Sequence, residues 1–291
     1  MSRTVPAIKT CKLFIDGAFV RSESGRTMPV DAGDTTLHVA RASRKDLRDA
    51  VEAARKAQPD WQQRTGYSRG QILYRLAEML EARSSELIES VRASHASRMD
   101  VRAARREVAA AIDRVVGFAG WCDKLHHVLG CGNNVAGPYY NFSVPEPSGA
   151  AVLLTPADPA LLALLTVLAT SLCAGAACSV IAAESAPLPA VIVSEACATA
   201  DVPRGVVNIL TAMHSELLDH VASHREVACV IAVGVSPSER ALLERGRAEN
   251  LKRVHVLDRD RDAWFDDQHC ESPEEIARFM EIKTIWHPSA M

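Results

Sequence analysis

The residues best suited to covalent chemistry are the eight cysteines, which stand at positions 11, 122, 131, 173, 178, 197, 229 and 270. None forms a C-x-x-C pair and several lie in apolar runs, which is typical of reduced thiols used as small core residues. Cys270 has His269 and Glu271 as neighbours, and an adjacent imidazolium lowers the pKa of a thiol. Neighbours in a loop need not face each other, however, and no oxyanion donors accompany them. We therefore predict no catalytic role for Cys270.

Two further motifs could bind ligands. His126, His127 and Cys131 form an H-H-x₃-C pattern, a partial metal-ligand set without a fourth member; exposed histidines at a helix end are the favoured interpretation, and we predict no metal. Ser236 and Glu239 begin a predicted helix just after Gly234. A free helix N-terminus attracts phosphate, although ordinary capping is the favoured interpretation here.

Composition describes a globular chain of 291 residues, 48% hydrophobic and 24% charged, with a formal net charge of −3. This length allows one large core or two domains. The near-neutral charge gives no electrostatic attraction to nucleic acid or to a membrane surface. No apolar run reaches the roughly 20 residues of a membrane span, and residues 1–12 lack the apolar core of a signal peptide. We expect cytoplasmic localisation, with no nucleic-acid or membrane partner.

The first half of the chain predicts a hairpin and then helices. Residues 11–20 alternate around an Asp16-Gly17 turn. Ser43 and Asp46 predict a capped helix start, and the apolar face that follows should end at Pro59. Two more amphipathic helices are predicted by apolar residues at helical spacing, one over residues 68–91 and one over 102–129.

Short apolar strands alternate with helices in the second half. Strands are predicted at residues 150–154, 178–181, 206–210, 228–233 and 254–257, and helices at 159–173, 187–200, 215–223 and 237–249. This alternation predicts an α/β fold, a Rossmann-like parallel sheet of about five strands with helices on both faces. Residues 137–149 alternate like an extended arm, whereas 258–274 are charged and without pattern, as in a linker.

The order of several short motifs resembles the NAD(P)-dependent aldehyde dehydrogenase superfamily over residues 12–257 and 279–288. The motifs are KLFIDGAFV (12–20) for the opening hairpin, EPSG (146–149) for R-E-P-x-G, TPADP (155–159) for P-W-N-F-P, LCAGAA (172–177) for A-L-x-x-G-N-T, IAAESAPL (181–188) for K-P-A-E-x-T-P-L, PRGVVNILT (203–211) for P-x-G-V-V-N-V-V-T, NLKRV (250–254) for the run into L-E-L-G-G-K, and RFMEIKTIWHP (278–288) for the closing strand near Y-x-E-x-K-T-V.

The resemblance implies that the family's catalytic groups are missing. The domain that carries the cysteine nucleophile would lie between residues 257 and 279, where about twenty hydrophilic residues stand, far fewer than a domain needs. Asp158 replaces the asparagine whose amide stabilises the oxyanion, and a carboxylate has no N–H to donate. Leu257 falls near the general-base glutamate, and Arg259 and Asp260 replace its Gly-Gly pair. The resemblance therefore predicts no catalytic residues.

The coenzyme site that the resemblance implies lacks some of the family's coenzyme-binding residues. Ile181 replaces the lysine that contacts the adenosine ribose, while Glu184 matches the ribose-binding acid, although a solvated loop-end glutamate is the favoured interpretation. The remaining vestigial positions lie in the family's coenzyme turns and are Thr155, Pro156, Gly234 and Ser236. We predict no cofactor, or weakly bound NAD(P).

The family's oligomerisation element is retained in two pieces. We predict an aldehyde-dehydrogenase-like coenzyme domain over residues 8–136 and 149–257, an oligomerisation arm and closing strand over 137–148 and 279–291, and a linker over 258–278. Exposed strand edges need partners, so the closing strand should pair with its own arm or with another subunit. The predicted interface residues are Tyr139, Tyr140, Phe142, Ile282, Ile285 and Trp286.

These observations predict a non-catalytic aldehyde dehydrogenase homologue. It would act as a structural or regulatory subunit, as a homo-oligomer or as a hetero-oligomer with a full-length aldehyde dehydrogenase. The first alternative is an NAD(P)-dependent oxidoreductase subunit for aldehyde oxidation whose active site a partner chain completes. The second alternative is a stand-alone nucleotide-binding protein.

Overall fold

A seven-stranded sheet forms the centre of the molecule, which a computed structural model describes over residues 10–32, 35–94 and 99–289. The predicted segment ends at residues 8–9 and 290–291 lie outside the described residues. The strands follow in the spatial order β12 (Arg253–Leu257), β11 (Cys229–Val233), β8 (Ala151–Leu154), β9 (Cys178–Ala182), β10 (Val207–Thr211), β2 (Leu13–Ile15) and β3 (Ala18–Val20). The first five are parallel, as predicted, and the opening hairpin extends the sheet because β2 pairs antiparallel with β10.

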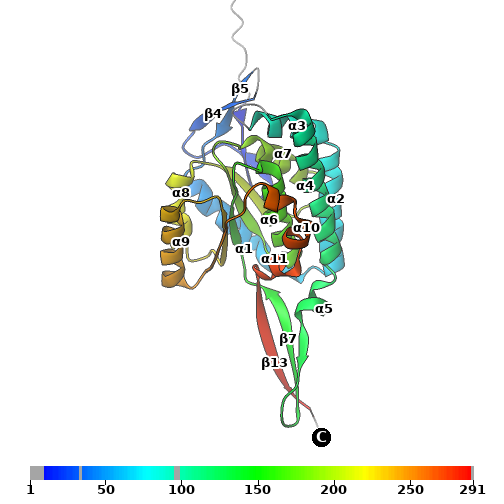
Figure 1. Ribbon diagram of the computed structural model, residues 1–291. Coiled ribbons are helices and arrows are strands. Elements are labelled where there is room, and N and C mark those ends of the chain that lie inside the picture. The colour runs from blue at the N-terminus through cyan, green and yellow to red at the C-terminus, as the bar shows by residue number, and fades with distance from the viewer. Residues whose placement is uncertain (1–9, 33–34, 95–98, 290–291) are drawn as a thin grey trace, which may run out of the picture.

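Helices cover both faces of this sheet (Figure 1). One face carries α1 (Arg44–Gln63), α8 (His214–Ser223) and α9 (Pro237–Asn250). The other carries α2 (Gly66–Glu81), α3 (Ser84–Ala93), α4 (Val101–Trp121), α6 (Ala160–Ala174) and α7 (Leu188–Cys197). Successive strand residues supply opposite faces, so Leu153 joins the second core while Val152 and Leu154 join the first.

Helix boundaries differ from the prediction at three places. Pro59 does not end α1, because its ring is solvent-exposed and the final turn buries Trp61 against the core. Residues 68–91 form two helices, with a turn in which the Arg83 N–H bonds the carbonyl of Leu80. The third predicted helix also divides, into α4 and the short α5 (Leu125–Leu129). In the second and third cases the apolar spacing continues across a break that tertiary packing produces.

Two smaller sheets complete the described structure. Near the N-terminus, β1 (Thr10–Cys11), β5 (Thr36–Ala40) and β4 (Thr27–Asp31) form a sheet that the sequence pattern did not predict. The predicted arm and closing strand do pair, as β7 (Tyr139–Pro147) and β13 (Met280–Pro288), with β6 (Cys131–Asn133) on the other edge. Their antiparallel register sets Ile285 opposite Phe142. Figure 1 shows this arm projecting from the body of the molecule.

The expectation of an unpatterned linker at residues 258–278 is wrong. The segment folds into η1 (Asp262–Phe265), α10 (Asp267–Cys270) and α11 (Pro273–Ala277), which lie in front of α6 in Figure 1. Trp264, Cys270 and Ile276 are fully buried and belong to the main hydrophobic core. The sequence did not predict this role, because the segment is rich in charged residues and its few apolar side chains fit no regular period.

A buried arginine fixes the same segment to the helices beneath it. Arg114 of α4 is completely buried, and its guanidinium donates to the Trp264 carbonyl (3.1 Å), to Asp267 Oδ1 (2.7 Å) and to Thr166 Oγ1 (3.1 Å). A buried charge is tolerated only with such partners. Residues 258–278 are therefore an integral part of the fold. None of the described helices combines the length and the apolar character that crossing a membrane requires.

Candidate functional site

The carboxyl ends of the parallel strands form the edge at which open α/β sheets bind ligands. From β8 the chain proceeds outward through β9 and β10, and then returns to the other side of β8 as β11. The order therefore reverses between β8 and β11, and such switch points leave a crevice. Thr155 and Pro156 follow β8, and Gly234 follows β11. Gly234 has a φ of +67°, and a Cβ there would lie 3.3 Å from the Pro156 Cβ. The structure thus brings these three predicted residues to one place.

The helix start at Ser236 is already occupied by a carboxylate of the chain. Ser236 Oγ accepts the Glu239 N–H (3.4 Å), and the Ser236 N–H bonds Glu239 Oε2 (2.7 Å), which completes a capping box. This backbone bond from Ser236 holds the pKa of Glu239 below its ordinary value. A phosphate at the N-terminus of α9 would meet this negative charge. Capping, the favoured interpretation of the sequence, is the geometry observed.

Glu184 also serves a helix start. Its Oε2 accepts the backbone N–H of His214 (3.2 Å), the first residue of α8. A ring nitrogen of His214 lies 3.2 Å from the Ala182 carbonyl. His214 therefore joins the beginning of α8 to the end of β9. The sequence reasoning missed it, although its position just after a predicted strand was the available signal.

Ile181, at the position of the family's ribose-contacting lysine, has no access to this crevice. Its side chain is fully buried in the core between the sheet and helices α1 and α8. An apolar side chain there offers no hydrogen-bond donor. Glu184 is thus the one polar side chain at this turn for which the resemblance predicts a coenzyme contact.

An ion-pair cluster occupies the position expected for the oxyanion site. Arg261 pairs with Asp158, and its Nη2 donates to Glu107 Oε2 at 2.7 Å. Glu107 is fully buried and its Oε1 accepts the Leu161 N–H (3.0 Å) at the start of α6. Both ends of the guanidinium are engaged by carboxylates. At this position the structure therefore holds a carboxylate paired with an arginine, in place of an amide donor.

Cys270 lacks the geometry of a nucleophile. Its thiol is buried and lies 3.3 Å from the Ala263 carbonyl. Burial raises the pKa of this thiol, and the nearby Arg259 opposes that shift only in part. His269 points instead to Asp266, with 2.7 Å between Nδ1 and Oδ2, and 79% of its side chain is exposed. Cysteine and histidine therefore form no catalytic pair.

The other positions that resemble active-site groups have structural roles. Leu257 is buried in the main core at the end of β12. Arg259 pairs with Glu275 (2.6 Å), and Asp260 Oδ1 accepts the Ala263 N–H (2.8 Å) at the start of η1. None of these three can act as a general base toward the crevice from these positions.

The His126, His127 and Cys131 motif does not converge. The histidines lie on α5, and the Cys131 thiol bonds Asn133 Oδ1 at 3.2 Å on β6. Throughout the described ranges, no three His, Cys, Asp or Glu residues gather in a way that could hold a metal ion.

The predicted interface residues lie on the arm, on both faces of its sheet. Tyr139 and Trp286 stack edge to face, 5.7 Å between ring centroids, and are 47% and 58% exposed. Tyr140 is 62% exposed and lies 5.3 Å from the ring of Phe142, while Ile282 is 58% exposed. Phe142 and its cross-strand partner Ile285 are half-buried. The arm thus exposes large apolar side chains that a folded monomer leaves uncovered.

The fold and this crevice define a doubly wound α/β domain of the dinucleotide-binding type, with a projecting β arm. Residues 19–257 match the aldehyde dehydrogenase family, and the chain belongs to that family. It is 30% identical over 253 residues to retinal dehydrogenase 2 of Homo sapiens, covering 85% of this chain and 48% of that protein. It is also 30% identical over 253 residues to cytosolic aldehyde dehydrogenase 1 of Elephantulus edwardii, covering 85% and 50%.

Solved structures show the same fold. An aldehyde dehydrogenase of Bacillus cereus in complex with NAD⁺ superposes with a TM-score of 0.79 at 24% identity, covering 85% of this chain and 50% of that one. HpcC of Thermus thermophilus gives a TM-score of 0.79 at 25% identity, covering 85% and 48%. The chain spans about half the length of the relatives it matches.

Proposed function

We propose that this chain is a non-catalytic member of the aldehyde dehydrogenase family that acts as a structural or regulatory subunit of an oligomer. The observation that carries the proposal is the arm, which projects from the body and exposes Tyr139, Tyr140, Ile282 and Trp286. Clusters of exposed aromatic residues are characteristic of interfaces. The partner is a second copy of the chain or a full-length aldehyde dehydrogenase.

Strand edges on the arm support the same proposal. In the order β13-β7-β6, the outer edge of the nine-residue β13 has no neighbouring strand within the described chain. An exposed edge of this length leaves a row of backbone N–H and C=O groups ready to pair with another strand. Pairing with another subunit would satisfy these groups and bury Ile282 and Trp286 together.

The residues that stand at the positions of the family's catalytic groups support the proposed loss of catalysis. Cys270 is a buried thiol that lies against the Ala263 carbonyl, and Arg261 bonds the carboxylate that replaces the oxyanion donor. Residues 258–278 pack on α4 and α6 through Arg114 and Trp264. The residues of the crevice also fit a dinucleotide poorly, because Glu239 occupies the α9 start and Ile181 is buried. We derive no coenzyme-dependent step from this site.

Assembly is tested by sedimentation equilibrium of the full chain, with light scattering as a second measurement. We expect an oligomer at micromolar concentration, and dissociation when Tyr140→Ser and Trp286→Ser are combined. Tyr74→Ser is the matched control, because Tyr74 is 52% exposed on α2, away from the arm. A stable monomer for the unchanged chain, with no effect of either variant, would contradict the proposed assembly.

Activity is tested by following NADH formation with short and long aldehydes. We expect none above the blank for the isolated chain. Activity that disappears in Cys270→Ala would refute the non-catalytic proposal. Activity that arises only when a full-length aldehyde dehydrogenase is added, beyond what that enzyme gives alone, would favour the alternative in which a partner completes the site.

A further inference from the structure

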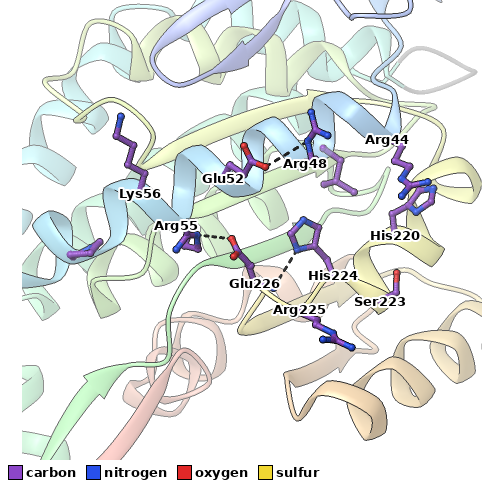
Figure 2. A pocket seen from close by; sticks show the side chains of 12 residues that line it. Arg44, Arg48, Glu52, Arg55, Lys56, His220, Ser223, His224, Arg225 and Glu226 are labelled. Carbon is purple, nitrogen blue, oxygen red and sulfur yellow. Dashed lines mark hydrogen bonds and ion pairs between the residues drawn. The ribbon is translucent and has the colours of Figure 1, made fainter.

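A basic groove lies between α1, α8 and the loop before β11, well away from the crevice described above. Its volume is about 850 Å³, within the range of small-molecule sites. Its lower wall includes Arg225 and Glu226, which precede β11 and so lie at the amino edge of the sheet, whereas the coenzyme-type turns follow the strands. Figure 2 shows the side chains of α1, α8 and the loop before β11 that line this groove, with Arg55 of α1 directed at Glu226.

The groove concentrates positive charge in a chain whose net charge is −3. Its two carboxylates are already paired, since Glu52 lies 3.6 Å from Arg48 and Glu226 lies 2.5 Å from Arg55. Its remaining cations have no carboxylate partner within the described residues, and they are Arg44, Lys56 and Arg225. An excess of unpaired cations in a concave site attracts anions.

The carboxyl end of α8 forms part of the wall, and its negative dipole would oppose an anion. Lys252 removes this obstacle, because its Nζ donates to the carbonyls of Val221 (2.6 Å) and His224 (2.9 Å). Lys252 is buried, and burial lowers its own pKa to about 8. Burial first, and Lys252 next, lower the pKa of His224. Lys252 therefore satisfies two carbonyls at the end of α8 and offsets the negative end of the helix dipole from behind the wall of the groove.

We propose that this groove binds the di- or triphosphate group of a small ligand. Arg44 and Lys56 lie about 18 Å apart along α1, at 1.5 Å per residue, so a ligand that contacts both must extend beyond its phosphate group. Arg225 lies on the other wall, in the loop before β11. Pro59, which is exposed, supplies an apolar contact at one end of the groove. Long polyanions are disfavoured, because the net negative charge of the whole chain repels them outside the groove.

The test is calorimetry on the full chain at low salt, with inorganic tripolyphosphate and ATP as probes. We expect saturable binding of both, weakened by about tenfold or more when Lys56→Gln and Arg225→Gln are combined. The matched control combines Arg102→Gln and Arg105→Gln, which make the same change of charge on the exposed side of α4, on the other face of the sheet. The control should bind as the unchanged chain does.

Comparing the affinities of the two probes distinguishes the possible sources of the phosphate group. Tighter binding of ATP than of tripolyphosphate identifies a nucleotide, and equal affinity identifies the polyphosphate alone; both outcomes support the groove. The proposal is overturned if neither probe binds, if the control pair weakens binding equally, or if Ser236→Ala at the other edge of the sheet weakens it instead. Preferential binding of a single-stranded oligonucleotide would also overturn it.

Discussion

Replacing Trp264 tests whether residues 258–278 hold the molecule together. Trp264 is fully buried in the main core, and the Arg259 guanidinium lies 5.1 Å from its ring centroid. The hydrogen bond from Arg114 goes to the Trp264 backbone carbonyl and survives substitution. Trp264→Ala therefore removes the side chain alone, and truncation of a buried tryptophan costs about 3–5 kcal/mol. That is a large share of the roughly 5–15 kcal/mol that stabilises a domain.

A second substitution at the same site separates volume from polarity. The buried Trp264 indole N–H has no hydrogen-bond acceptor among the residues that the structure describes, and an unsatisfied donor costs about 1–3 kcal/mol. Trp264→Phe keeps most of the ring and removes this donor. We expect it to be much less destabilising than Trp264→Ala, and close to neutral.

Urea denaturation followed by circular dichroism measures both effects as changes in the free energy of unfolding. Tyr67→Ala is the control, because it truncates an aromatic side chain that is largely exposed on α2. A loss below about 0.5 kcal/mol for Trp264→Ala, equal to that of the control, would refute the reasoning, because changes of that size are typical of surface sites. Residues 258–278 would then be a loosely attached segment after all.

Two further predictions concern the coenzyme and pH. We expect NAD⁺ and NADP⁺ to bind weakly or not at all in calorimetry, because each lost charge-assisted hydrogen bond weakens binding about ten- to a hundredfold; micromolar binding that Glu184→Ala abolishes would show a working adenosine site. We also expect the free energy of unfolding to decrease as pH falls below about 6.5. Burial first, and neighbouring cations next, lower the folded-state pKa of His126, His224 and His255 from that value. The unfolded chain therefore takes up protons that the folded chain does not, so stability is present above pH 6.5 and lost on acidification. Urea midpoints at pH 7.5 and 5.5 measure this loss, which His255→Leu should reduce; equal midpoints would contradict it.

Local signals in the sequence determined much of the fold. The capping residues Ser43 and Ser236, each with an acid three positions later, predicted helix starts that the structure shows with both capping-box bonds. Five apolar runs predicted the five parallel strands, because strands buried on both faces need continuous apolar sequence. The arm and the closing strand were likewise expected to be extended. These features depend on a residue and its near neighbours, so sequence alone specifies them.

Other features depend on contacts between distant segments. The breaks after Glu81 and Trp121 lie within continuous helical periodicity, and only packing decided where the helices turn. His214 acquires its role because Glu184 and the Ala182 carbonyl, some thirty residues earlier in the chain, lie beside it in the fold, which no local pattern records.

Residues 258–278 are the clearest case of a decision made by tertiary structure. Trp264, Cys270 and Ile276 are too few and too irregularly spaced to indicate a core segment, yet all three are fully buried. They fold because α4 and α6 provide an apolar surface and because Arg114, fully buried, finds its partners in this segment. Nothing in the sequence indicates that an arginine such as Arg114 is buried rather than exposed to solvent. Its burial becomes favourable only when the folded chain supplies a carbonyl and a carboxylate within hydrogen-bond distance.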